Sequence, residues 1–187
     1  MSVTVVAGVP GVGLSTLVEH VRPELDDEFE LINFGDVMLE QAAVADLATS
    51  RSELGDLSQR ETRRLQRRAG EFVADRAESR RVLLTTHLVV ETAVGFLPGL
   101  PDAVLEDVAP DRLVIVEAEP SLIDERRSAA DREYGDASVQ AVEFEQDLNR
   151  TAAFEYAVSA DAPISLVENE GDIEAAVATM EDVLDGD

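Results

Sequence analysis

Residues 3–16 read VTVVAGVPGVGLST, and this stretch decides the fold. Its first five residues are apolar or β-branched, which predicts a short strand buried on both faces. Three glycines follow, and apolar residues at helical spacing begin after Ser15. A glycine-rich turn between a strand and a helix is the setting of the phosphate-binding motif G-x-x-x-x-G-K-[ST]. Such a turn can direct backbone N–H groups at an anion, with the positive end of the helix dipole behind them.

One residue departs from that motif. Leu14 occupies the lysine position, and leucine neither carries charge nor donates a hydrogen bond. The hydroxyl of Ser15 can still ligate Mg²⁺, and Thr16 can donate to a phosphate oxygen. We expect a true phosphate loop, and a turn that binds nothing is the alternative.

Short apolar runs alternate with helical patterns along the rest of the chain. Strands are expected at 3–7, 30–34, 81–86, 112–117 and 163–167. Helices are expected at 15–25, 36–47, 58–78, 101–108, 120–132, 138–159 and 171–184, with Asp36 and Ser58 as helix caps. The alternation predicts an α/β domain, a five-stranded parallel sheet with helices on both faces. Residues 49–58 and 128–138 are expected to be mobile connections inside a single domain, 1–187.

The composition limits the possible partners. There are 40 acidic and 15 basic residues, a formal net charge of −25, and every basic residue is arginine. Such a surface repels nucleic acids and anionic membranes, so we expect neither as a partner. Acidity without lysine favours a salt-adapted cytosol, where salt screens the self-repulsion of the chain. With no cysteine, no signal peptide and no apolar run of membrane-spanning length, a cytoplasmic protein is expected.

Beyond the loop, the chain resembles the archaeal adenylate kinases over nearly its whole length. The matching segments are residues 8–13, 33–38, 66–70, 86–87, 95–101, 126–127, 131–132, 149–150 and 167–169, together with Arg51. Two further departures accompany Leu14: Thr85 stands where the family tends to have aspartate, and Gly55 where it has a second arginine.

The resemblance implies a P-loop NTPase fold and the reaction ATP + AMP to 2 ADP, with ATP and Mg²⁺ required. It implies an AMP-binding insert at about 34–70, a short lid at about 121–145, and a homotrimer. The implied ATP-binding residues are Gly8, Val9, Pro10, Gly11, Val12, Gly13, Leu14, Ser15, Thr16 and Asn169, with Ser15 on the metal. The implied AMP-binding residues are Phe34, Gly35, Arg51, His87, Gly95 and Leu97. The implied catalytic cations are Arg126, Arg127, Arg132 and Arg150, since arginine grips phosphate oxygens bidentately.

Each of these assignments has a simpler alternative. Any one of the arginines alone could be a surface ion-pair partner. His87 could be a buried histidine bonded to backbone, and Phe34, Phe96 and Leu97 could be core residues. At the level of function, the alternatives are another small-molecule P-loop kinase, or a module that binds nucleotide without turnover.

Overall fold

The computed structural model describes residues 2–92, 95–130 and 138–186. Its main sheet has five parallel strands in the order β2-β3-β1-β6-β7. The strands are β1 (Val3–Ala7), β2 (Phe29–Asn33), β3 (Arg81–Thr86), β6 (Arg112–Glu117) and β7 (Ile164–Glu168). The predicted fold class is confirmed, and each strand lies within one residue of its expected range.

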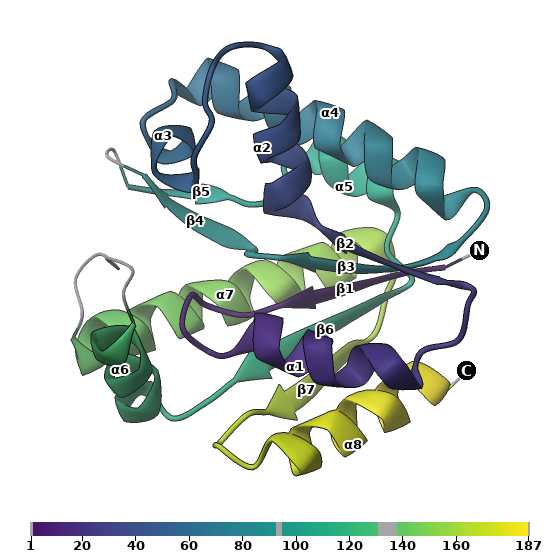
Figure 1. The fold of residues 1–187 in the computed structure, drawn as a ribbon, viewed down its shortest axis with the longest axis vertical. Coiled ribbons are helices and arrows are strands. Elements are labelled where there is room, and N and C mark those ends of the chain that lie inside the picture. The colour runs from purple at the N-terminus through teal and green to yellow at the C-terminus, as the bar shows by residue number, and fades with distance from the viewer. Residues whose placement is uncertain (1, 93–94, 131–137, 187) are drawn as a thin grey trace.

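Helices cover both faces of this sheet. Figure 1 shows α2, α4 and α5 on one side and α1 and α8 on the other. The helices are α1 (Leu14–Val21), η1 (Arg22–Glu24), α2 (Phe34–Val44), α3 (Arg51–Gly55), α4 (Gln59–Ala77), α5 (Asp102–Val108), α6 (Pro120–Ala129), α7 (Val139–Ala160) and α8 (Ile173–Asp185). Among the described residues, no helix combines the length and apolar character that a membrane span requires.

The alternation of side chains along the strands builds two apolar layers. Val5 of β1 lies in the layer beneath α4, α5 and α7, whereas its neighbour Val6 lies in the layer beneath α1 and α8. Both valines are fully buried, as expected for a central strand of a parallel sheet. The prediction of a strand buried on both faces is confirmed.

Two local predictions were wrong, and one pair of strands had not been predicted. Helix α2 begins at Phe34 and is capped by Asn33, whose side chain accepts from the Asp36 N–H, so Asp36 is not the cap. The segment 49–58 contains α3, capped by Ser50, instead of being only a mobile connection. The antiparallel hairpin β4 (Val89–Thr92) and β5 (Gly95–Pro98) was not expected. Most of 128–138, Arg132 included, falls outside the described residues.

Other capping predictions hold. Ser58 accepts from the Glu61 N–H, and the Glu61 carboxylate accepts from the Ser58 N–H, so α4 begins with the expected capping box. The Ser58 hydroxyl also donates to the Glu61 carboxylate, and this hydrogen bond, together with the one from the Ser58 N–H, lowers the pKa of Glu61.

β1 lies between β3 and β6, and the chain leaves it toward β2. In a parallel sheet, the loops that follow such a central strand and its neighbours meet at one edge, where ligands bind. Here those loops begin at Gly8, His87 and Ala118. The fold therefore gathers three loops at the end of β1.

Candidate nucleotide-binding site

The turn after β1 has the geometry of an anion cradle. Gly13 occupies the position before α1 with φ of 90°, a left-handed conformation that disfavours residues with a side chain. No side chain caps this helix, so its first N–H groups have no partner within it. These groups and the helix dipole suit a phosphate.

Side chains from distant segments hold the carbonyl groups of this turn. His87, just after β3, lies with Nδ1 2.7 Å from the Gly8 carbonyl oxygen, which fixes this ring nitrogen as the protonated one. Arg127 of α6 donates from Nε to the Pro10 carbonyl oxygen at 2.8 Å. This contact matches the simpler alternative given for His87, a histidine that is hydrogen-bonded to the backbone.

The Val12 carbonyl accepts two further hydrogen bonds. Arg126 donates from Nη1 at 3.0 Å and Asn169 from Nδ2 at 2.9 Å, and Arg126 also donates from Nη2 to the Asn169 carbonyl. With its carbonyls bonded to side chains around it, the turn keeps one shape before any ligand arrives.

The first of two cavities beside the turn has a volume of about 360 Å³. It lies between the turn, the helices α2, α3 and α4, and the β4–β5 hairpin, and its walls are more apolar than polar. Five of the six expected AMP-binding residues line it: Phe34, Gly35, Arg51, His87 and Leu97. Gly95 does not, and lies exposed at the start of β5.

The second cavity, about 540 Å³, lies on the other side of the turn. Arg126, Asn169 and Ile173 contribute to its walls, along with Gly11, Gly13 and Thr16. Both cavities share Val9, Pro10, Leu14, Ser15 and His87. The turn is thus the common wall of two adjoining chambers.

Leu14 faces both chambers and also packs against the apolar layer under α1. It supplies no charge there. The side chains that bring positive charge to the turn are Arg126 and Arg127, each bonded to one of its carbonyls. Residue 14 therefore has a packing role in place of a phosphate contact.

Arg127 is buried, with 5% of its surface exposed. Besides Pro10, it donates to both carboxylate oxygens of Glu145 on α7, at 3.0 and 2.6 Å. Both residues line the first cavity, and their charges neutralise each other. Arg127 thus ties α6, α7 and the turn together.

Arg51 lies over the start of α2. It donates to Asn33 and pairs with Asp36, and its guanidinium occupies the space that a Cβ on Gly35 would need. Glycine at 35 is what permits this close approach. The cation is therefore held at the wall of the first cavity.

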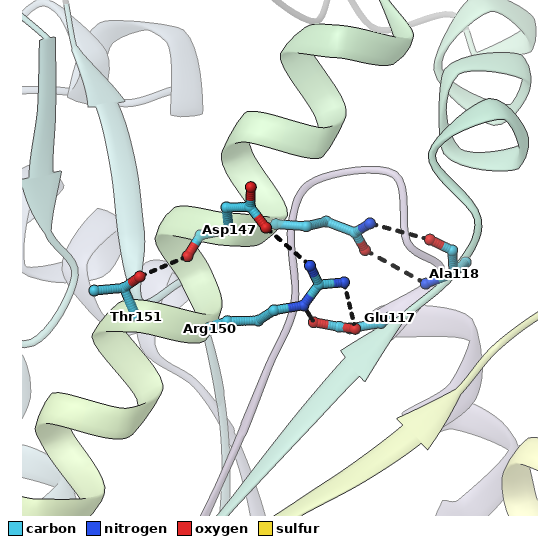
Figure 2. Close-up of polar contacts among 6 residues, drawn as sticks. Glu117, Ala118, Asp147, Arg150 and Thr151 are labelled. Atoms are coloured by element: carbon cyan, nitrogen blue, oxygen red, sulfur yellow. Dashed lines mark hydrogen bonds and ion pairs between the residues drawn. The ribbon is translucent and has the colours of Figure 1, made fainter.

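Arg150 lies outside both chambers. Figure 2 shows it reaching from α7 to Glu117 at the end of β6, with a second contact to Asp147. Hydrogen bonding to Glu117 is the main cause of the raised pKa of its guanidinium, and burial opposes it. It lines a separate hollow of mainly acidic residues, so the structure does not bring Arg150 to Arg126 and Arg127.

Two buried amides in the first cavity were not assigned a role from the sequence. Gln66 of α4 and Asn149 of α7 are each 3% exposed and line the cavity. Asn149 has no hydrogen-bonding partner for its side chain among the described residues, yet neither amide atom is sealed from solvent. The sequence offered one signal for these two residues: each is a polar side chain at a helix position that the apolar pattern places in the core.

The residues next to the turn that could hold a metal carry hydroxyl groups. Ser15, Thr85 and Thr86 line the first cavity. Its described carboxylate residues are Glu145, which is held by Arg127, and Glu91, which lies on the β4–β5 hairpin. Within residues 2–92, 95–130 and 138–186, no three His, Asp or Glu side chains are arranged to hold a metal. Such a set fits Mg²⁺ that stays bound to phosphate oxygens and water, with a single protein hydroxyl.

Comparison with known proteins gives concordant matches. Residues 7–143 match the family described as "AAA domain". The adenylate kinase of Methanothermobacter thermautotrophicus is 38% identical over 187 residues, covering 99% of this chain and all of the relative. That of Thermococcus onnurineus is 36% identical over 186 residues, covering 98% of this chain and 95% of the relative.

Among solved structures, shikimate kinase from Bacteroides thetaiotaomicron has a similar fold, with a TM-score of 0.59 and 17% identity. The match covers 98% of both chains. At that identity the likeness concerns the fold, a P-loop kinase arrangement of sheet and helices.

Proposed function

The chain belongs to the AAA-domain family and, within it, to the adenylate kinases, and we propose that its two chambers carry AMP and ATP for the reaction ATP + AMP to 2 ADP. One observation supports this most strongly: two adjoining cavities share the turn after β1 as their common wall. Phosphoryl transfer requires two nucleotides whose phosphates meet in line. A shared anion cradle provides that meeting point.

The first cavity is assigned to AMP. Arg51, held over Gly35, supplies a cation, and Phe34 and Leu97 supply apolar walls. Of the expected contacts, Gly95 is the one whose position offers no support. The AMP-binding insert at about 34–70 thus corresponds to α2, α3 and the first half of α4.

The second cavity is assigned to the adenosine part of ATP. Asn169 and Arg126 line it beside the turn, so that the triphosphate would run from this chamber over the N–H groups of residues 8–16. Main-chain amides and the positive end of α1 would take the place of the missing lysine.

Arginines would stabilise the charge on the transferring group. Arg126 and Arg127 lie at the turn, on a helix inside the lid range 121–145. Arg150 would take part only after leaving Glu117, and Arg132 lies outside the described residues. Lid closure would bring these cations together and exclude water.

Mg²⁺ would be held mainly by the phosphates, with the Ser15 hydroxyl as its protein ligand. When bound, the metal neutralises charge on the bridging oxygens. Thr85, in place of an aspartate, would bind a metal-associated water through a neutral hydroxyl.

We further propose a homotrimer, as inferred from the resemblance. Support comes from apolar side chains exposed on α7 and on the edge strand β7 that it contacts: Phe154, Val158, Ile164 and Leu166. Exposed apolar surface of this kind favours contact with another copy. Light scattering after size exclusion, with Phe154→Glu as the disrupting variant, tests the oligomer.

A salt-adapted cytoplasm is the setting proposed for this enzyme. The net charge of −25 supports it, because self-repulsion falls as salt screens the surface. Unfolding by denaturant in 0.2 M and 2 M KCl is the test. A free energy of unfolding that did not rise with KCl would contradict this proposal.

The reaction itself is tested by mixing the folded protein with ATP, AMP and Mg²⁺ in concentrated KCl and measuring ADP. Formation of two ADP per ATP consumed is expected. ATP binding without ADP formation would favour a non-enzymatic module, and a faster reaction with another acceptor would favour a different small-molecule kinase. In a panel of monophosphates and sugars, AMP should be the best acceptor.

A further inference from the structure

Gln66 has its side-chain amide fixed in one orientation. From the middle of α4, its Nε2 donates to the carbonyl oxygens of Pro98 and Gly99, each at 3.0 Å. Because both neighbours are acceptors, the nitrogen must face them and the oxygen must face away. Packing keeps the side chain in place, since Gln66 is 97% buried.

The Oε1 oxygen of Gln66 is left unused. Among the described residues it has no hydrogen-bonding partner, although it is not sealed from solvent, and Gln66 lines the first cavity. An acceptor that faces a cavity and lacks a protein partner is open to water or to a ligand. The cavity therefore presents one fixed acceptor, without the donor that a freely turning amide would offer.

Gln146 shows the opposite arrangement. It is equally buried, but both ends of its amide bond to Ala118: Nε2 donates to the carbonyl and Oε1 accepts from the N–H. Gln146 thus closes its own hydrogen bonds within the structure. Two buried glutamines in one chain differ in a single respect, the free oxygen of Gln66.

The position of Gln66 places this acceptor in the part of the cavity that suits a base. The phosphate of a bound nucleotide belongs at the turn, where N–H groups and cations gather. On the helical side of the cavity the lining includes Met38, Leu54 and Thr62, and Arg51 is the cation among the described residues there. A planar base fits there, with one polar contact to define it.

We propose that Gln66 is a specificity-determining residue whose Oε1 accepts a hydrogen bond from the exocyclic amine of the acceptor's adenine. A base with hydrogen at that position leaves the oxygen unpaired, and a 6-oxo base places a second acceptor against it. Sites that leave a buried polar group unpaired reject the mismatched substrate strongly. This inference rests on AMP occupying the first cavity.

The test compares AMP with purine riboside 5′-monophosphate, which lacks only the amine. For the wild type, kcat/KM for AMP should exceed that for the analogue by about tenfold or more. In Gln66→Leu this ratio should fall to within about threefold of unity, with the KM for ATP changed less than twofold. IMP, with its 6-oxo group, should gain relative to AMP in the same variant.

Gln146→Leu is the matched control. It removes an equally buried amide and should lower the free energy of unfolding, yet leave the ratio between AMP and the analogue at the wild-type value. A ratio that also collapsed in this control, or that persisted in Gln66→Leu, would overturn the assignment.

Two readouts separate this inference from the proposed function. If the wild type phosphorylates AMP and the ratio is unchanged in Gln66→Leu, the reaction stands and the role of Gln66 is wrong. If Gln66→Leu does not fold, the wild type alone decides by calorimetry: equal Kd values for AMP and the analogue overturn the role of Gln66, and about tenfold tighter AMP binding supports it.

Discussion

Arg127 and Glu145 form a forked ion pair that joins α6 to α7 beneath the phosphate turn. The side chain of Arg127 is 2% exposed, and its Nε donates to the Pro10 carbonyl. Both residues lie within the proposed lid range 121–145, so this pair ties that range to the turn. Arg127 therefore stabilises the turn, while Glu145 neutralises its charge.

Glu145→Gln should strongly destabilise the protein. Breaking a buried pair leaves an uncompensated charge, which costs about 3–5 kcal/mol. Denaturant unfolding checks this, read as a shift in midpoint at constant slope. Asp147→Asn is the control: Asp147 pairs with Arg150 but is 71% exposed, so its loss should cost less than about 1 kcal/mol. Equal losses in the two variants would contradict the structural role of the Arg127 pair.

Gly35→Ala should weaken AMP binding and leave ATP binding intact. The added Cβ would collide with the Arg51 guanidinium and displace it from the start of α2. We expect the KM for AMP to rise about tenfold, the loss of one charge-assisted contact. Arg51→Ala should give the same defect, and the double variant should be no worse than either. Additive losses would mean that Gly35 acts independently of Arg51.

Leu14→Lys should change kcat/KM by less than about tenfold, because amides and two arginines already serve the turn. Leu14 packs on the apolar layer, so the variant should also be slightly less stable. Steady-state kinetics with ATP varied is the measurement. A rise of a hundredfold or more would show that the site lacks a cation, contrary to the roles given to Arg126 and Arg127.

Tyr156→Phe should loosen the β4–β5 hairpin. The Tyr156 hydroxyl donates to the Leu88 carbonyl and accepts from the Leu100 N–H, so it holds the residues that flank the hairpin on both sides. Removing it leaves the buried Leu100 N–H unpaired, whereas the Leu88 carbonyl still accepts from the Gly99 N–H, so the expected cost is about 1–3 kcal/mol. Urea unfolding at pH 8 measures this loss, and a change below about 0.5 kcal/mol would contradict it.

The same residue predicts an alkaline pH dependence. Burial raises the pKa of Tyr156 above its ordinary value of 10.0. The folded state therefore keeps the phenol neutral after the unfolded state has ionised, so its contribution is complete below pH 10 and is lost as pH rises through the folded pKa. Wild-type stability should fall above pH 10 more steeply than that of Tyr156→Phe. With no lysine in the chain, few other groups titrate there, and parallel curves would contradict the prediction.

The sheet was predictable because its information is local. Residues 3–7 and 81–86 are short segments centred on Val and Leu, and both form strands with the predicted bounds. Asn and Asp are both good N-cap residues, and helix α2 begins three residues earlier than predicted, so Asn33 and not Asp36 is its cap. Helix α3 is short, polar outside and supported by Leu54, which packs on Ala48 and Leu65 from other segments. Such tertiary support leaves little local signal.

The candidate site was predictable in membership more than in arrangement. The loop, Arg51, His87 and Asn169 were named from motif and resemblance, and each lines a cavity beside the turn. The sequence did not reveal which residues form ion pairs when they lie far apart in the chain. Arg150 donates to Glu117, 33 positions away. With 40 carboxylates available, no pattern in the chain selects that partner.

The turn after β1 takes its shape from side chains that arrive from β3, α6 and the segment after β7. A truncated chain that lacks the segment after β7 would contain the glycine-rich motif but would not fix the conformation of the turn. The turn should therefore become able to bind phosphate late in folding, after these distant segments have packed together. In the assembled protein, nucleotide bound there should raise the melting temperature of the whole domain, because it binds only where every contributor is in place.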